Sequence, residues 1–108
     1  MADITVRELK ELLDKGTALK IIDVREEWEF DTDHIEAENI PMGIITAKVN
    51  DPGFQELKQQ EFVVYCRSGA RSGNVAGFLR SQGYSGVKNL IGGMLAWRAE
   101  INPDFNVE

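Results

Sequence analysis

The residues of this chain best suited to chemistry form one short segment, residues 66–72, which reads Cys-Arg-Ser-Gly-Ala-Arg-Ser. The β-branched and aromatic run 62–65 before it predicts a strand, and the apolar spacing of 72–82 after it predicts a helix. A thiol at that junction meets the positive end of the helix dipole and several unpaired backbone N–H groups. Gly69 and its small neighbours allow those N–H groups to converge on one anion. We therefore expect Cys66 to be a nucleophilic thiolate in a pocket for a small anion.

The two arginines of this segment strengthen that interpretation. An unperturbed thiol has a pKa of about 8.5, so only a few per cent of it is ionised at neutral pH. Lowering that pKa by about two units requires about 2.7 kcal/mol, whereas an exposed helix terminus supplies about 0.3–1 kcal/mol. We expect the N–H groups and the guanidinium groups of Arg67 and Arg71 to supply the rest. The alternative is a buried, inert cysteine, but paired arginines beside a thiol are hard to explain by packing.

Length and composition limit the other classes of function. A chain of 108 residues fits one domain, which we place over residues 1–108. Lys and Arg total 12 against 18 Asp and Glu, so the formal charge of −6 argues against binding to nucleic acid or an anionic membrane. No apolar run is long enough to span a membrane, and no stretch resembles a signal peptide, so we expect a cytoplasmic protein.

The same sequence offers little for a metal or an organic cofactor. Cys66 is the only cysteine and His34 the only histidine, which excludes an intramolecular disulfide and a zinc site of these ligands. The glycine-rich dinucleotide motif and the lysine-containing phosphate-binding motif are both missing. We therefore expect no metal and no cofactor.

The elements that must position Cys66 alternate between strands and helices. This alternation favours an α/β fold with a mostly parallel sheet, although the strand order does not follow from it. Thr5 and Glu8 have the spacing of a helix capping box, and Gly73 and Gly77 suggest close packing of the helix after Cys66. The expected strands are 19–24, 62–65 and 87–90 with a short extended piece at 39–41, and the expected helical segments are 5–16, 25–30, 51–60, 72–82 and 94–99.

Several motifs together resemble the rhodanese family of sulfurtransferases along nearly the whole chain. Asp23-Val-Arg25 with Glu29-Phe30 and His34-Ile35 is similar to the first family signature, and Asn39-Ile-Pro41 continues it. Residues 66–72 resemble the active-site loop, and Gly92-Gly93 with Ala96-Trp97 resembles the closing signature. The resemblance implies a rhodanese-like single domain, with a mostly parallel five-stranded sheet flanked by helices on both faces.

The resemblance also implies a reaction. Such enzymes take the outer sulfur of a small anionic donor such as thiosulfate onto the cysteine as a persulfide, and a nucleophilic acceptor then removes it. The acceptor is cyanide in the test tube and a thiol or protein cysteine in cells. By position, Cys66 is the implied nucleophile, and the implied substrate-binding residues are Arg67, Ser68, Gly69, Ala70, Arg71 and Ser72. We expect a monomer or weak dimer.

Two other functions stay open at this point. One is a non-enzymatic interaction module of the same family, although a charged loop around an intact Cys66 argues against it. The other is a small cysteine-dependent phosphatase or arsenate reductase. Such phosphatases place five residues between cysteine and arginine, whereas Cys66 and Arg71 enclose four, and the shorter loop suits a single sulfur atom better than a tetrahedral phosphate.

Residues near the site are assigned structural roles. We expect Asp23 and Arg25 to fix a strand end as a hydrogen-bonded pair, and His34 to act as scaffold rather than as a general base. Trp28 and Trp97 are predicted to pack in the core, and the carboxylates at 26, 27 and 29 to form a solvated face. The family pattern is altered at Asp33 and in the shortened stretch 36–38, where the acidic side chains of Asp33 and Glu36 would disfavour free anionic donors.

Overall fold

The sheet of this protein has four parallel strands in the order β2-β1-β3-β4. The computed structural model describes residues 3–107, so residues 1, 2 and 108 of the predicted domain lie outside the described part. In chain order the strands are β1 (Lys20–Asp23), β2 (Glu38–Asn39), β3 (Phe62–Tyr65) and β4 (Val87–Asn89). Because all four run in the same direction, the segments that follow them gather at one edge of the sheet.

The expected fifth strand is wrong. Beyond β4, the described chain adds only one bridge, in which Ile4 lies parallel to Leu90. The N–H of Ile4 donates to Asn89 O at 3.0 Å, and the N–H of Ile91 donates to Ile4 O at 2.8 Å. Thr5 directly after it already caps a helix, so the chain turns away before a second residue can pair.

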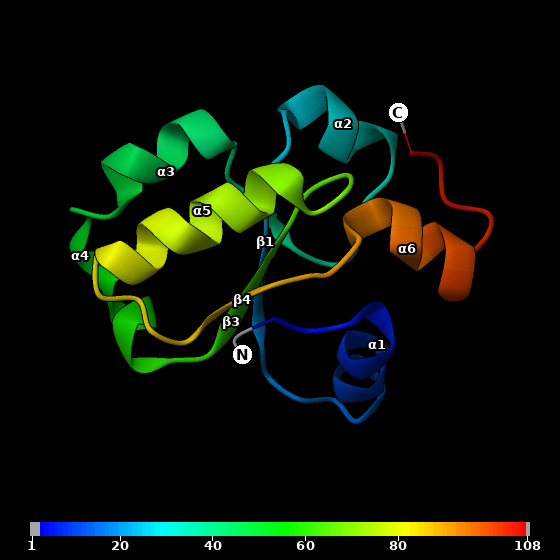
Figure 1. Cartoon of the computed structure of the whole chain (residues 1–108), viewed down its shortest axis with the longest axis horizontal. Coiled ribbons are helices and arrows are strands. Elements are labelled where there is room, and N and C mark those ends of the chain that lie inside the picture. Colours follow the sequence, from blue (N-terminus) through cyan, green and yellow to red (C-terminus); the bar gives the residue numbers. More distant parts are fainter. Residues whose placement is uncertain (1–2, 108) are drawn as a thin grey trace.

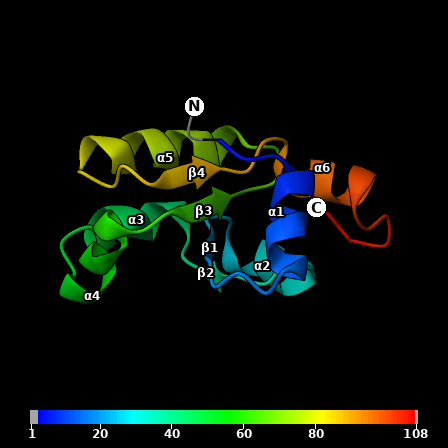
Figure 2. The same ribbon diagram turned by 90° about the horizontal axis from the view of Figure 1, so that it is seen from below.

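Helices cover both faces of the sheet, as the family resemblance implies. Figures 1 and 2 show α3, α4 and α5 on one side of the strands and α1 and α6 on the other, with α2 beyond the end of β1. None of the described helices is long and apolar enough to cross a membrane. The helical segments are α1 (Val6–Asp14), α2 (Glu27–Thr32), α3 (Met42–Lys48), α4 (Pro52–Gln55), the 3-10 helix η1 (Glu56–Gln59), α5 (Ala70–Ser81) and α6 (Gly93–Glu100).

The alternation of side chains along β3 divides the core into two clusters. Phe62 and Val64 join the cluster under α3 and α5, while Val63 and Tyr65 join the cluster under α1 and α6. Cys66 continues the first series, so its side chain enters the cluster beneath α5. The strand period therefore decides which helix supplies the groups around the sulfur.

Local sequence signals mark the starts of α1 and α4. The Thr5–Glu8 capping box is present at the start of α1, and Asp51 caps α4 by accepting the N–H of Gly53. The one helix without a sequence prediction is α3. Its sequence, Met-Gly-Ile-Ile-Thr-Ala-Lys, contains glycine and β-branched residues and has no capping side chain, so intrinsic propensity gives it little support. Burial of Ile45 against the core stabilises it instead.

The two glycines of α5 differ in their surroundings. A Cβ added to Gly73 would lie 3.4 Å from Nδ2 of Asn89, which is the close packing that the sequence suggests. A Cβ on Gly77 would meet nothing within 4 Å, so the predicted close approach is wrong at that position.

Gly77→Ala should therefore stabilise the protein. Alanine lowers the entropy of the unfolded chain and favours helix, so we expect the free energy of unfolding to rise by about 0.5–1 kcal/mol. Urea denaturation measures the change. Gly86→Ala is the contrasting variant, because its Cβ would lie 3.1 Å from Cα of Glu61 and closer still to the carbonyl of Gln60. Equal loss of stability in both variants would contradict the assignment of Gly77 to open space.

Candidate active site

Cys66 lies directly after β3 with its sulfur turned toward the start of α5. Its side chain is 1% exposed. The N–H of Gly69 approaches Sγ at 3.1 Å, and both the N–H and the hydroxyl of Ser72 approach it at 3.4 Å. The sulfur therefore lies among apolar core residues on one side and among converging donors on the other.

The loop backbone has this orientation because α6 holds its carbonyl groups. Met94 N–H donates to Cys66 O and Leu95 N–H donates to Arg67 O, each at 3.0 Å. With those carbonyl oxygens turned toward α6, the following N–H groups turn toward Sγ. Gly69, at φ +101°, completes the turn in a left-handed conformation that other residues rarely adopt, and it leads into α5.

Gly93 permits the close approach of α6 to the loop. Its φ is +53°, and a Cβ at this position would lie 2.7 Å from Arg67 O and closer still to Cys66 O. Any side chain there would push α6 away from the carbonyls that it binds. Gly93 is thus part of the geometry of the Cys66 loop, although it lies far from Cys66 in the sequence.

The surroundings of Cys66 act on its pKa in opposite directions. Burial by itself raises the pKa of the thiol. The hydroxyl and N–H of Ser72 lower it, and so do the N–H groups of Gly69 and Ser68. These hydrogen bonds outweigh burial, and the pKa of Cys66 lies below its ordinary value. The thiolate is therefore favoured mainly by hydrogen bonds of the loop itself.

Asn89 at the end of β4 orders the hydroxyl that faces the sulfur. Its Nδ2 donates to Gly69 O at 3.2 Å, and its Oδ1 accepts from the hydroxyl of Ser72 at 2.6 Å. A hydroxyl has one hydrogen, so Ser72 donates either to Oδ1 of Asn89 or to Sγ of Cys66. Sequence reasoning missed Asn89, because an asparagine at a strand end carries no signal that points to a partner on α5.

Arg71 has a partner that the sequence does not predict. Its two terminal nitrogens donate to Oε1 and Oε2 of Glu29 at 2.8 and 2.9 Å, while its side chain is 34% exposed. Glu29 is 5% exposed, so the prediction of a solvated carboxylate there is wrong. The hydrogen bonds from Arg71 hold the pKa of Glu29 below its ordinary value despite burial. This pair ties α5 to α2 beside the loop.

The predicted pair of Asp23 and Arg25 is present and buried at the end of β1. Arg25 Nη2 donates to Oδ2 of Asp23 at 2.7 Å and to the carbonyl of Asp33 at 2.8 Å. Asn39 Nδ2 donates to the carbonyls of both Asp23 and Arg25 at 3.0 Å. These bonds fix the turn between β1 and α2, which carries Glu29 toward Arg71.

His34 and Asp33 are occupied away from the sulfur. The ring of His34 stacks on Phe30 with centroids 3.8 Å apart, and its Nδ1 lies 2.9 Å from Ile35 O. The carboxylate of Asp33 accepts N–H bonds from His34 at 3.0 Å and from Asn106 at 3.2 Å. Asp33 thereby ties the C-terminal segment to the end of α2.

The remaining loop residues lie at the surface. Arg67, Ser68 and Ala70 are exposed, in contrast to the buried Ser72. The loop therefore presents small groups and the Arg67 side chain to an incoming molecule.

Within residues 3–107, no three His, Cys, Asp or Glu side chains are close enough to hold a metal ion together.

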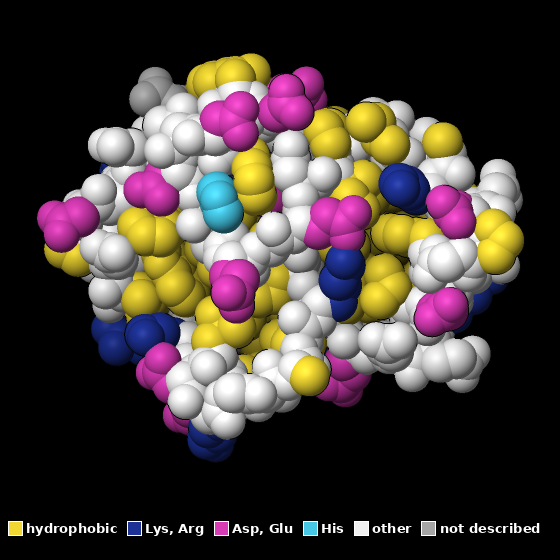
Figure 3. Space-filling model, turned by 180° about the vertical axis from the view of Figure 1, so that it is seen from behind, with side chains coloured by type: hydrophobic (Ala, Val, Ile, Leu, Met, Phe, Trp, Pro, Cys, Tyr) yellow, Lys and Arg dark blue, Asp and Glu magenta, His cyan; other side chains and the backbone are white. Residues whose placement is uncertain are grey.

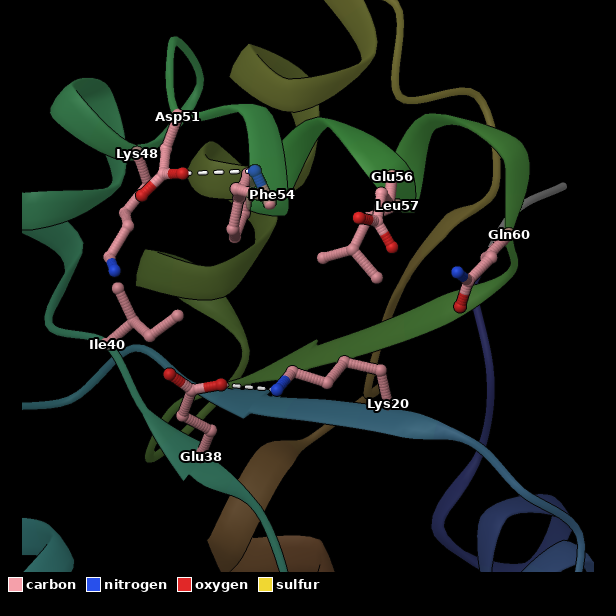
Figure 4. A pocket seen from close by; sticks show the side chains of 10 residues that line it. Lys20, Glu38, Ile40, Lys48, Asp51, Phe54, Glu56, Leu57 and Gln60 are labelled. Carbon is pink, nitrogen blue, oxygen red and sulfur yellow. Dashed lines mark hydrogen bonds and ion pairs between the residues drawn. The ribbon is translucent and has the colours of Figure 1, made fainter.

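A separate pocket of about 360 Å³ lies away from this loop, and none of residues 66–72 lines it. Figure 4 shows Phe54 and Leu57 facing an ion pair in which Lys20 of β1 meets Glu38 of β2. Lys20 begins β1 and Gln60 precedes β3, whereas Cys66 follows β3. The pocket is thus not part of the cysteine site.

Ser72→Ala should raise the pKa of Cys66. The variant keeps the backbone N–H and loses the hydroxyl, so we expect a higher pKa of Cys66 and an alkylation rate at pH 7 that is lower by several-fold. The measurement is the pH dependence of Cys66 alkylation by iodoacetamide. Ser68→Ala is the control, since only its backbone N–H acts on the thiol. An unchanged pH profile in Ser72→Ala would contradict the role of the hydroxyl.

Glu29→Gln should destabilise the protein in a pH-dependent way. A lowered carboxyl pKa stabilises the fold above the ordinary glutamate pKa, and this contribution disappears as the pH falls through the folded value. We expect a loss of about 1–3 kcal/mol at pH 7, moderated by the partial exposure of Arg71, and a difference from the wild type that shrinks as the pH falls through the lowered pKa of Glu29. Urea denaturation from pH 3 to 7 measures it, with exposed Glu27→Gln as control. A pH-independent difference would contradict the ion pair.

Comparison with protein families gives one match over most of the chain. The model of the rhodanese-like domain matches residues 5–100. YtwF of Bacillus subtilis, a candidate sulfurtransferase by name, is 40% identical over 102 residues, covering 94% of each chain. MoeZ of Mycobacterium tuberculosis, named as a probable adenylyltransferase/sulfurtransferase, is 38% identical over 104 residues. The match covers 94% of this chain but 26% of MoeZ, so this chain corresponds to about a quarter of that relative.

Solved structures agree with the fold. The crystal structure of a rhodanese-like domain protein from Staphylococcus aureus is 30% identical with a TM-score of 0.80, covering 100% of this chain and 99% of the other. The human single-domain sulfurtransferase TSTD1 is 26% identical with a TM-score of 0.77, covering 93% and 97%. With its parallel sheet, its cysteine loop between β3 and α5 and these matches, the chain belongs to the rhodanese-like domain family.

Proposed function

We propose that this protein moves sulfane sulfur from an anionic donor such as thiosulfate to a nucleophilic acceptor through a persulfide on Cys66. The observation that carries the proposal is the convergence of the Gly69 and Ser72 donors on Sγ, which lowers the pKa of the thiol although the side chain is buried. The sulfurtransferase names of YtwF, MoeZ and TSTD1 support this class of reaction.

The proposed reaction has two displacement steps. The Cys66 thiolate attacks the outer sulfur of thiosulfate, the S–S bond of the donor breaks, and sulfite leaves with the bonding electron pair. The acceptor, cyanide or a thiolate, then attacks the outer sulfur of the persulfide, and the Cys66 thiolate leaves. Donors that stabilise negative charge on Sγ favour both the free thiolate and its departure in the second step.

The loop residues divide these tasks in our proposal. The backbone N–H groups from Ser68 to Ser72 hold the thiolate and then the persulfide, and the small side chain of Ala70 leaves room for the outer sulfur. Exposed Arg67 attracts the donor anion. Arg71 fixes α5 against α2 through its hydrogen bonds to Glu29. Its positive charge also interacts with the nearby Cys66.

The geometry gives less support to a phosphatase or an arsenate reductase. Those reactions require a guanidinium group facing a tetrahedral oxyanion, and both terminal nitrogens of Arg71 donate to Glu29. The lowered pKa of Cys66 likewise has no purpose in a non-enzymatic interaction module. A free thiolate requires a reducing compartment, so we place the protein in the cytoplasm.

Intact-mass spectrometry after brief exposure to thiosulfate tests the proposal. Cys66 is the only cysteine, so a gain of one sulfur atom in mass places the persulfide without further mapping. We expect this gain in the wild type, its disappearance on addition of cyanide with formation of thiocyanate, and no gain in Cys66→Ser. Release of phosphate from an aryl phosphate without any sulfur uptake would refute the proposal in favour of the phosphatase.

A further inference from the structure

The exposed large hydrophobic side chains of residues 3–107 share one edge of the sheet. They are Trp28, Met42, Ile44 and Ile91, and Trp28 is 60% exposed although the sequence predicts it to be packed. Trp28 follows β1, Met42 and Ile44 follow β2, and Ile91 follows β4. Cys66 follows β3, and the strands are parallel, so all four lie at the edge that carries the sulfur. Single exposed hydrophobics are ordinary, but their gathering at the reactive edge marks an interaction surface.

An apolar groove extends this surface between α3 and α5. It has a volume of about 250 Å³, and its lining is almost entirely apolar. Met42 and Ile45 line it from α3, and Val75 and Phe78 from α5. Val75 lies one helical turn beyond Ser72, whose hydroxyl and N–H contact Sγ. The groove therefore starts close to the reactive cysteine.

The segment that leaves this edge after β1 and leads into β2 carries a concentration of negative charge. Residues 26–38 contain seven of the 18 acidic residues of the chain and no lysine or arginine. Glu29 and Glu38 are neutralised by Arg71 and Lys20, but Glu27, Asp31 and Glu36 are exposed and form no ion pair within residues 3–107. Figure 3 shows hydrophobic and acidic side chains next to each other over α2 at the upper edge.

We propose that this edge, comprising Trp28, the acidic side chains of α2 and the α3–α5 groove, docks a protein acceptor whose cysteine lies on a basic, apolar segment. The proposal rests on the sulfurtransferase function and specifies its acceptor. A small acceptor such as cyanide would leave the apolar side chains uncovered and would form no ion pairs with the carboxylates. Lysine or arginine side chains of a protein segment pair with Glu27 and Asp31, while its apolar side chains cover Trp28 and the groove.

The depth of the sulfur limits the shape of the acceptor. Because Cys66 is 1% exposed, an acceptor has to reach into the loop to meet the outer sulfur of its persulfide. A cysteine on a protruding loop or tail can reach that atom, whereas one on a flat surface cannot. Its thiolate attacks the outer sulfur, the S–S bond to Cys66 breaks, and Cys66 leaves as a thiolate, so the acceptor carries the persulfide.

Sulfur transfer to synthetic peptides tests this surface. Two peptides of equal length carry one central cysteine, flanked by lysine and leucine in one and by glutamate and leucine in the other. Mass spectrometry follows the transfer from preloaded Cys66. We expect the basic peptide to react about tenfold faster at low salt and to lose this advantage as salt rises. Equal rates for the two peptides would overturn the proposal.

Variants of the edge separate docking from chemistry. Trp28→Ser and the double variant Glu27→Gln/Asp31→Asn should each slow transfer to the basic peptide several-fold while leaving transfer to cyanide unchanged. The matched control is Glu56→Gln/Glu61→Gln, which removes the same charge before β3 at the opposite edge. The docking surface would be refuted if the edge variants kept the preference for the basic peptide. It would also be refuted if the control variant lost that preference to the same extent.

A binding measurement keeps this test independent of the proposed function. The basic peptide with serine in place of its cysteine is titrated into the unmodified protein by calorimetry. Binding that is weakened by Trp28→Ser supports the docking surface even if thiosulfate loads no sulfur onto Cys66. Sulfur loading and transfer to cyanide without any binding of this peptide would uphold the sulfurtransferase and reject the surface.

Discussion

Two hydrogen bonds from the first turn of α6 turn the loop carbonyls away from the sulfur. They join Met94 N–H to Cys66 O and Leu95 N–H to Arg67 O. A peptide unit has its carbonyl and N–H groups on opposite sides, so this orientation directs the N–H groups of the loop toward Sγ. Without the close approach that Gly93 permits, the same loop residues would not form a donor ring. The arrangement of donors around Cys66 thus depends on a helix that contributes no side chain to it.

Burial and hydrogen bonding have opposite effects on the ionisation of the Cys66 thiol. The sulfur enters the apolar cluster under α5, which opposes ionisation, and the donors of Gly69 and Ser72 overcome that cost. Neighbouring charges are arranged in pairs, Asp23 with Arg25 and Glu29 with Arg71, which brace the ends of β1, α2 and α5. A buried sulfur held by fixed donors is accessible only to a narrow reactant, which agrees with an edge shaped for a protein segment.

The extent of sequence-based prediction differs between local and tertiary features. The Thr5–Glu8 capping box and the strand 62–65 follow from signals within a few residues, and both are present. On α2, however, Trp28 and Glu29 were assigned the reverse of their environments. Adjacent helical positions face directions about 100° apart, so a small rotation exchanges them, and the distant Arg71 sets that rotation by drawing Glu29 inward.

The sequence alone determined the α/β class, the strand–loop–helix around Cys66 and the position of a thiol just before a helix, because these depend on residue type and short spacing. Only the tertiary structure decided that Asn89 orders the Ser72 hydroxyl, that Arg71 binds Glu29, and that the sheet has four strands. Each of these joins segments far apart in the chain. The pairing energy of such groups depends on distances that no local pattern encodes.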